Sequence, residues 1–423
     1  MIARLTVLSM LKNEVLVYQY KKYTYFYPSF LHHILKTHYI MKHLIFTGLL
    51  LFFFYFAVAQ TADTAKVYTL ADTVVANRLI EEGKALNAKG ENEKAVQMIE
   101  KCLSIRASIF GDYSLPVANT YNWLGIVHAE ADKYEKAITF FNKSLEIKEK
   151  KLGNLHSELA WIYNNIGNAY MGKGEYQLSV NFHKKALNIR LLKKDSLGIA
   201  TSYFNIGNLQ YYLSDFENAL LNLNASLKIR HSILGKNHPD IASTYNSLGV
   251  IFDDLGEPKK SLEYFSKALQ IRILKLGPYH PKVGSLYDNI GVAHHRLNDF
   301  QKAIEFSQKS LDIKIKNGGG QALGTAYSYT NLARYYAKKK QYRFDFYEKA
   351  INILINLFGE NHHTLATVYG NLGMTQVLAG NFHIATENLK KSLELRLKLL
   401  GEVHYDVITS YDNLGYCYDE MKD

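Results

Sequence analysis

Cysteine is nearly absent from this chain, whose 423 residues include only Cys102 and Cys417, far apart in the sequence. A disulfide needs Cα atoms within about 7 Å of each other, so we expect two free thiols and no disulfide framework. A concentrated stripe of charge is also missing. The formal net charge is +11, but the bases are spread along the chain, whereas a nucleic-acid-binding surface favours clustered bases. The sequence therefore predicts no nucleic-acid partner.

Motifs for catalysis, cofactors or metals are missing as well. The segment from Gly167 to Gly174 resembles a phosphate-binding loop, but it ends in glycine where Ser or Thr would bind the metal. Histidines recur at the repeat interval of the sequence. Histidines of neighbouring copies are expected to lie about a helix-packing distance apart, 8–10 Å. That is too far for them to share a zinc ion, whose bonds are roughly 2.0–2.1 Å long. We expect these histidines to cap helices, and we expect no enzyme, no cofactor and no metal site. They are His156, His238, His280, His362 and His404.

What the chain does contain is a repeat. A Leu/Ile-Gly pair returns at steps of 42 or 40 residues, which is typical of a stacked repeat array. The second residue of the pair defines position zero of each copy and stands at Gly125, Gly167, Gly207, Gly249, Gly291, Ala333, Gly373 and Gly415, with Gly83 another step before.

The pattern inside one copy predicts two helices. A tyrosine at position −4, an apolar residue at −1 and the small residue at zero form an i, i+3, i+4 stripe, which indicates a helix with one buried face. A second run of the same period follows a short turn, as from Tyr134 to Ile147. Glycine inside a helix costs roughly 1 kcal/mol relative to alanine. Its recurrence therefore predicts a position where the partner helix comes too close for a Cβ.

These residues resemble the tetratricopeptide repeat family, in the longer form found in kinesin light chains. The resemblance rests on the Y-N-x-L-G, G-x-Y-x-x-A, A-L-x-I-R and L-G-x-x-H-P segments, and it covers residues 72–423. It implies an all-α, right-handed superhelical solenoid of stacked antiparallel helix pairs, used as a binding scaffold. Some copies depart from the pattern, since Ala333 replaces the glycine and the loop at 317–320 lacks the histidine.

The N-terminal region differs from the repeats. Residues 41–59 combine a positive Lys42, an apolar run and a small-x-small site before Gln60, which predicts a secretory signal cleaved between Ala59 and Gln60. Residues 1–40 are then expected to be either an upstream extension wrongly assigned to the protein or a disordered cytosolic tail. Without residues 1–59 the net charge is +6, because that segment carries six bases and one acid. We expect export to the periplasm or beyond the cell, with no membrane insertion of the mature chain; an uncleaved N-terminal anchor is the alternative.

The remaining boundaries follow from the repeat. We expect a polar lead-in at 60–75 and a solenoid at 76–423, with eight helix pairs and one unpaired helix. That last helix keeps the apolar stripe of a full unit, so we also expect a chain that is cut short at its C-terminus. The sequence does not indicate an oligomeric state.

One face of the first helix in each copy is the candidate binding surface. Positions −6, −2, +1 and +5, which we call the first-helix face, lie about 150–170° from the buried stripe. Asparagine recurs at −2, where its amide matches the groups of an extended peptide backbone; the alternative is a solvated face, or asparagines that tie one repeat to the next. The predicted groove residues are Asn165, Asn168, Asn205, Asn208, Asn289, Asn331, Asn371, Asn413, Tyr212, Asp254, Arg296, Arg334 and Lys338.

The side chains on this face change along the array, from tyrosines to aspartates to bases. Such a gradient would fix the orientation of a charged peptide ligand. A second series of bases lies on the second helices and is expected to pair with nearby acids in a solvated structural role. Its members are Arg106, Lys148, Arg190, Arg230, Arg272, Lys314 and Arg396. The sequence thus predicts an exported scaffold that binds a protein or peptide segment. Two alternatives stay open: the sensor half of a longer signalling enzyme, such as a histidine kinase or caspase-like peptidase fusion, and a structural spacer.

Overall fold

The structure, a computed structural model, describes residues 70–422. The predicted extension at 1–40, the signal segment at 41–59, its cleavage site at Ala59 and Gln60, and residues 60–69 of the lead-in lie outside the described residues. Residues 70–422 contain seventeen α-helices and one 3-10 helix, and no β-strand. The all-α prediction is confirmed.

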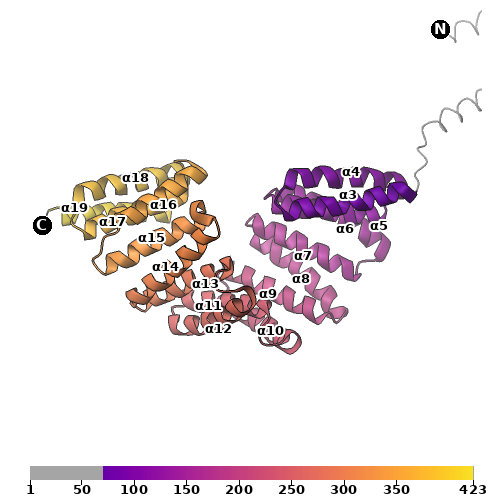
Figure 1. Cartoon of the computed structure of the whole chain (residues 1–423), viewed down its shortest axis with the longest axis horizontal. Coiled ribbons are helices and arrows are strands. Elements are labelled where there is room, and N and C mark those ends of the chain that lie inside the picture. Colours follow the sequence, from indigo (N-terminus) through magenta and orange to yellow (C-terminus); the bar gives the residue numbers. More distant parts are fainter. Residues whose placement is uncertain (1–69, 423) are drawn as a thin grey trace, which may run out of the picture. The chain divides into compact units, whose positions relative to one another are not determined.

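The helices alternate between two kinds (Figure 1). The first helices of the repeats are α3 (Leu70–Ala88), α5 (Leu115–Glu130), α7 (Ser157–Gly172), α9 (Ser196–Tyr212), α11 (Pro239–Asp254), α13 (Pro281–Arg296), α15 (Leu323–Lys338), α17 (His363–Leu378) and α19 (Tyr405–Glu420). The second helices are α4 (Asn92–Phe110), α6 (Tyr134–Leu152), α8 (Tyr176–Leu192), α10 (Phe216–Leu234), α12 (Pro258–Leu276), α14 (Phe300–Lys316), α16 (Phe344–Phe358) and α18 (Phe382–Leu400).

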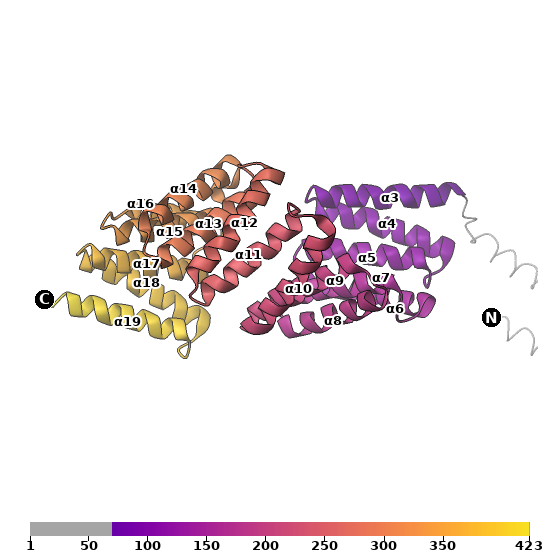
Figure 2. The same ribbon diagram turned by 90° about the horizontal axis from the view of Figure 1, so that it is seen from below.

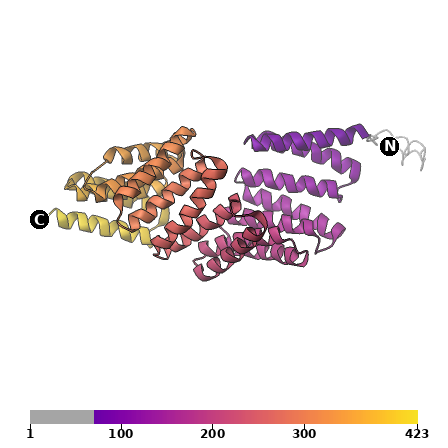
Figure 3. The same cartoon turned by 60° about the horizontal axis from the view of Figure 1, so that its bottom comes forward.

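Consecutive helices pack on each other throughout residues 70–422 (Figure 2). From α5 to α18 each first helix packs along its own second helix, and each second helix packs on the first helix of the next pair. Helix α3 packs on α4 where Gly83 meets Ile99. First helices also contact first helices of neighbouring pairs, as α5 contacts α7 and α15 contacts α17. The order of the stack follows the order of the sequence, which the colours from indigo to yellow trace in Figure 3. This is the architecture of a repeat solenoid.

The repeated glycines have the packing role that the pattern predicts. A Cβ built on Gly125 would lie 2.5 Å from the ring of Phe141, and one built on Gly249 would lie 2.5 Å from the ring of Phe265. Gly415 differs, because a Cβ there meets no atom within 4 Å. Its helix, α19, has no second helix after it among the described residues, so the close approach is a property of the helix pair.

The tyrosines at −4 are less buried than the stripe predicts. The apolar residue at −1 is fully enclosed, as Leu124 and Leu248 show, but the tyrosines of the first seven full copies are half-buried, and Tyr411 is exposed. Tyr287 illustrates the arrangement: its ring lies 5.8 Å from that of Phe306, and Lys309 Nζ lies 5.9 Å from its centre. The tyrosine therefore packs at the edge of the core, under an aromatic ring and a lysine of the second helix.

The loop histidines do cap helices. In each case the side-chain Nδ1 accepts a hydrogen bond from the backbone N–H two residues later, which satisfies one of the free donors at a helix start. The Nδ1 atoms of His238 and His280 lie 3.1 Å from the nitrogens of Asp240 and Lys282. The same bond is present at His156, His362 and His404.

Most bases of the second helices are hydrogen-bonded to the next repeat and are not paired with acids in solvent as predicted. Arg230 is 3% exposed, and it donates to the backbone oxygen of Asp240 (2.8 Å) and to Oγ1 of Thr244 (2.7 Å) in the next first helix. Most members of the series reach a carbonyl or hydroxyl of the following repeat in the same way, and only Lys148 and Lys314 have an acidic partner. The expectation of solvated pairs with acids is wrong for the others, because these side chains point into the joint between repeats. The others are Arg106, Arg190, Arg272 and Arg396.

Two irregularities match the departures in sequence. The helix α16 has 15 residues where α12 has 19, in the repeat that lacks two residues. The glycine-rich loop forms a short 3-10 helix at Gly319–Gln321, and the α15 that follows has no side-chain cap. At the N-terminal end, α3 begins at Leu70 rather than near residue 76, so the final part of the expected lead-in is already helical.

Candidate interaction surface on the first helices

The first-helix face is exposed along the array. The residue at +5 is exposed in all eight first helices from α5 to α19, which include Glu130, Gly172, Leu378 and Glu420. The residues at −2 are half-buried, because they lie nearer to the neighbouring first helix. The four positions therefore line one accessible strip, with −2 at its floor and +5 at its edge.

Half of the asparagines at −2 tie neighbouring repeats together. Asn165 Nδ2 donates to Oδ1 of Asn122 (3.2 Å), and Asn205 Nδ2 donates to Oδ1 of Asn164 (3.1 Å). A third bond of this kind joins Asn289 to Asn246 at 3.1 Å. The acceptor is always an asparagine at position −3 of the preceding copy. These amides already serve the joint between repeats, as the alternative interpretation proposed.

The other three asparagines lack that partner. The residue at −3 of the preceding copy is Asp288, Thr330 or Gly370, and within residues 70–422 the side-chain amides of Asn331, Asn371 and Asn413 have no hydrogen bond. Asp288 is engaged by Lys314, and the Thr330 hydroxyl donates to its own helix. The C-terminal half of the array thus carries the amides that remain available for a ligand.

The two asparagines at +1 differ from each other. Asn208 Nδ2 donates to the backbone oxygen of Phe204 in its own helix (3.0 Å). Asn168 is exposed and has no side-chain hydrogen bond within the described residues. The predicted row of amides is therefore discontinuous.

The middle of the face is neutralised by internal pairs. Arg296 contacts Asp253 through Nε at 2.8 Å and Asp254 through Nη2 at 3.1 Å. Asp254 also accepts a hydrogen bond from the Tyr211 hydroxyl at 2.7 Å. Burial, opposed by the charge of Arg296, raises the pKa of the Asp253 carboxyl, and burial together with the bond to Asp254 raises the pKa of Tyr211 to about 12. The predicted Asp254 and Arg296 mainly satisfy each other.

Positive charge remains at one place on the face. Arg334 and Lys338 are exposed on α15 and have no ion pair within residues 70–422. The ring of His295 stacks on Tyr335 at 4.8 Å, and its Nε2 is buried without a hydrogen-bond partner. Burial, followed by the charges of Arg334, Lys338 and Arg296, lowers the pKa of His295. The local field is therefore positive and favours an anionic group.

The sequence pattern placed Tyr212 on this face, but it missed the two tryptophans. Both tryptophans of the chain stand at its positions: Trp123 at −2 and Trp161 at −6. Trp161 is 62% exposed, and Tyr212 at +5 is 55% exposed and stacks on Tyr176. The signal was available, because reading the residues at −6 and −2 separates both tryptophans from the buried stripe.

A hollow of about 290 Å³ opens on the same face between α3 and α5. Its walls include Asn77, Glu81, Asn119 and Trp123. Lys84 Nζ lies 4.7 Å from the centre of the Trp123 ring and forms an ion pair with Glu81. A half-buried aromatic ring with polar neighbours at such a hollow is suited to holding an extended chain.

Residues 70–422 contain neither a cluster of metal ligands nor a helix that could span a membrane. No group of three or more His, Cys, Asp or Glu side chains is placed to hold a metal ion there. No helix in this part of the chain has the length and apolar character to cross a membrane. Cys102 and Cys417 are both buried free thiols, as expected.

Comparisons with known proteins bear on the family and the fold of the chain. The family model of tetratricopeptide repeats matches residues 76–150, 158–232, 222–273, 240–316, 283–343 and 344–398. A search of curated proteins found no match.

Solved structures with the same fold include the apo form of the quorum sensor NprR from B. thuringiensis (16% identity, 80% of this chain and 92% of that chain, TM-score 0.58). The apo form of RapI has 17% identity over 67% of this chain and 98% of that chain, with a TM-score of 0.54. A Rap protein complexed with competence and sporulation factor has 14% identity over 82% and 98%, with a TM-score of 0.52. At such identities the likeness concerns the fold. Because the family model covers most of the described residues, this chain belongs to the tetratricopeptide repeat family.

Proposed function

We propose that this protein is a scaffold that binds an extended segment of a partner protein on its first-helix face. The observation that carries the proposal is the exposure of large aromatic side chains at the face positions, led by Trp161 at 62%. Tryptophan, tyrosine and arginine are the residues that most often dominate binding energy at protein interfaces. Exposed aromatic residues that do not complete a core are therefore best explained by a partner.

The polar groups of the face suit the same ligand. The amides of Asn331 and Asn371 have no partner within the described residues, and the peptide backbone offers the matching donors and acceptors. Arg334 and Lys338 add positive charge beside them. We infer a partner segment that places an aromatic or apolar group near Trp161 or Tyr212 and an acidic group near Arg334.

Two further parts of the proposal rest on other observations. The Rap protein of the same fold was solved with a bound factor, which shows that this architecture accommodates a ligand in that protein. Export through the segment at 41–59 rests on the sequence pattern. We propose a binding role and no catalysis; a sensor role within a longer signalling protein is compatible with the same face.

A structural spacer is the second candidate. It is favoured by the bonds from Asn165, Asn205 and Asn289 to the preceding repeats, which give these asparagines a role that needs no ligand. The spacer makes no use of exposed Trp161 or of the unpaired bases on α15. The two candidates therefore differ in what surface variants do.

The test is selection of a displayed random-peptide library on the full chain, followed by affinity measurement on single peptides. Trp161→Ala is expected to weaken the selected peptides by about tenfold or more, as a lost hot spot of 1.4 kcal/mol or more would. Leu221→Ala is the matched control, since Leu221 is 67% exposed on the second helix α10. Peptides that bind both variants equally, or a selection that enriches none, would favour the spacer.

A further inference from the structure

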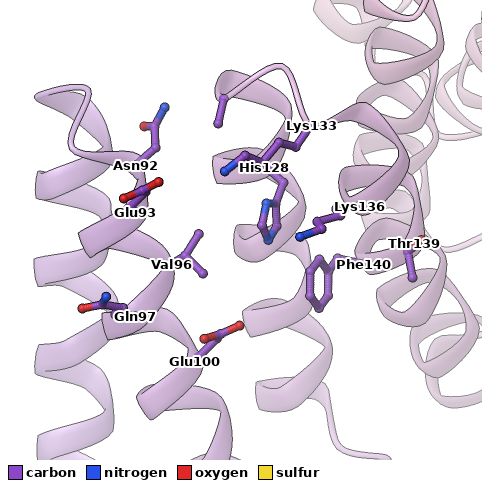
Figure 4. Close-up of a pocket in the computed structure, with 11 residues that line it drawn as sticks. Asn92, Glu93, Val96, Gln97, Glu100, His128, Lys133, Lys136, Thr139 and Phe140 are labelled. Carbon is purple, nitrogen blue, oxygen red and sulfur yellow. The ribbon is translucent and has the colours of Figure 1, made fainter.

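A second cavity lies away from the first-helix face, between the second helices α4 and α6 (Figure 4). Its volume is about 530 Å³, which is within the range of roughly 300–1,000 Å³ that small-molecule sites occupy. Helix α4 contributes Glu93 and Glu100, and the start of α6 and the turn before it contribute Lys133, Lys136 and Phe140. None of these residues is at a first-helix-face position, so this site is separate from the proposed binding surface.

The repeat itself explains why the cavity is open here. At the next joint, Lys173 forms an ion pair with Glu135 across the gap at 3.5 Å, and the Tyr134 ring packs against Gly172. One repeat earlier, the position of Lys173 is occupied by Ala131 and that of Tyr134 by Asn92. Two short side chains therefore replace the two that fill the next joint.

The same replacements leave polar groups without partners. Glu93 stands where Glu135 stands one repeat later, but the lysine that would reach it is absent. Glu93, Glu100, Lys133 and Lys136 have no ion pair within residues 70–422. The Oδ1 atom of Asn92 is buried and has no hydrogen bond. The site thus has free carboxylates on one wall and free ammonium groups on the other.

A buried histidine forms the floor of the pocket. His128 is 8% exposed, its Nδ1 has no hydrogen-bond partner, and its ring stacks on Phe140 with centres 5.3 Å apart and an angle of 4° between the planes. Burial, followed by the charges of Lys136 and Lys133, lowers the pKa of His128. The imidazole is therefore neutral at pH 7, so it offers one donor and one acceptor beside an aromatic surface.

We propose that this pocket binds a short dipolar ligand of about dipeptide size. Its cationic group lies at Glu93 and Glu100, its carboxylate at Lys133 and Lys136, and its apolar part on Phe140. Charge-assisted hydrogen bonds at both ends are stronger than neutral ones and fix the orientation of the ligand. A ligand with only one charge leaves the charged side chains of the opposite wall without a partner, and it therefore binds less tightly.

The test is titration calorimetry of the full chain with the dipeptide arginyl-phenylalanine. We expect measurable binding, and binding about tenfold weaker for the same dipeptide with a C-terminal amide, because the amide removes the charge that faces the lysines. Ala131→Lys introduces at this joint the lysine that Lys173 provides at the next joint. It is expected to weaken binding by about tenfold or more without lowering the melting temperature. Ala379→Lys, at the same repeat position directly after α17, is the matched control and is expected to bind like the unchanged protein.

Either of two results would overturn the proposal: no binding of arginyl-phenylalanine, or equal binding by the Ala131→Lys variant and the unchanged protein. Should Ala131→Lys lower the melting temperature, Glu93→Gln decides instead, since an amide keeps the size of the side chain and removes its charge. Unchanged affinity in that variant would reject the site.

Discussion

Gly125 and Phe141 are in such close contact that the glycine cannot be replaced without moving the ring. A Cβ at Gly125 would lie 2.5 Å from both Cδ1 and Cε1 of Phe141, whose side chain is 1% exposed in the core. Native interiors are close-packed, so the ring has little space into which it can move. The relationship joins the first and second helix of one repeat, and it recurs between Gly249 and Phe265.

We predict opposite signs for two glycine-to-alanine changes. Gly125→Ala gains up to about 1 kcal/mol of helix propensity, but overpacking a core costs about 1–3 kcal/mol, so a net loss of stability is expected. Gly415→Ala gains the same propensity and meets no atom within 4 Å, so it is expected to stabilise the chain. Thermal unfolding followed by circular dichroism measures both. Equal effects of the two changes would contradict the assignment of the glycine to helix pairing.

A second prediction concerns the hydrogen bond between buried Arg230 and Thr244: replacing both partners should cost less stability than replacing Thr244 alone. Thr244→Val removes the hydroxyl that Arg230 donates to, and since Nε of Arg230 is already without a partner, a cost of about 1–3 kcal/mol is expected. Replacing both partners by apolar groups can be nearly neutral. The chain contains such a pair at the same repeat positions, Leu354 and Val368, buried in one cluster. We therefore expect Arg230→Leu with Thr244→Val to be more stable than Thr244→Val alone.

A double-mutant cycle over the unchanged protein, Arg230→Leu, Thr244→Val and the double variant measures the coupling. A positive coupling between the two changes supports a specific bond across the joint between repeats. Simple addition of the two single losses would mean that Arg230 and Thr244 act independently.

The periodic features of this fold could be predicted from the sequence. The glycine contacts and the histidine caps follow from residue type and spacing, because each is decided within one repeat. The burial of the tyrosines could not be predicted fully, since the Tyr287 ring is covered by Phe306 and Lys309 on another helix, and the helical stripe does not indicate how far that cover reaches.

Interactions between repeats were harder to predict than those within one. The role of Asn165 depends on Asn122, which is 43 positions away, and the bases of the second helices appear solvated until the next first helix is placed. The cavity at Ala131 also depends on how two neighbouring repeats fit together, so one repeat alone does not reveal it. Comparing each residue with its counterpart one repeat later would have found these cases, because two short residues coincide at one joint.

The unpaired bases on α15 predict how partner binding depends on salt. This prediction rests on the proposed function. Changing Arg334 and Lys338 to alanine together is expected to slow association and to reduce its salt dependence, because rim charges act mainly on the encounter rate. The loss of affinity should be about fivefold at low salt and smaller at high salt, where the Debye length is about 3 Å at 1 M.

A charge-matched control is available on the second helices. Lys228 on α10 and Lys259 on α12 are exposed and have no ion pair within the described residues. Their double change to alanine alters the net charge equally, away from the first-helix face. Equal slowing in the two double variants would show that net charge, and not the position of Arg334 and Lys338, controls association.

His183 occupies a core position that an aromatic or aliphatic residue fills in neighbouring repeats. It is fully buried against Gly167, neither ring nitrogen has a hydrogen-bond partner, and Phe141 and Leu223 occupy the same position in neighbouring repeats. Burial, with a smaller contribution from the charge of Arg190, lowers its pKa from 6.5 to about 4. The folded state therefore takes up the proton later than the unfolded state as the pH falls.

Between pH 6.5 and 4 the unfolded chain binds more protons at this residue, so its contribution to the free energy of unfolding falls as the pH falls and levels off below pH 4. The shift corresponds to a loss of about 3 kcal/mol over that window. His183→Leu is expected to remove this part of the pH dependence, and at pH 7 it should stabilise the chain by about 1–2 kcal/mol, because two unpaired buried nitrogens are lost. Chemical unfolding at pH 7 and pH 4.5 of the unchanged protein, His183→Leu and His183→Phe measures the difference. A variant that keeps the full acid sensitivity would place its source in other groups.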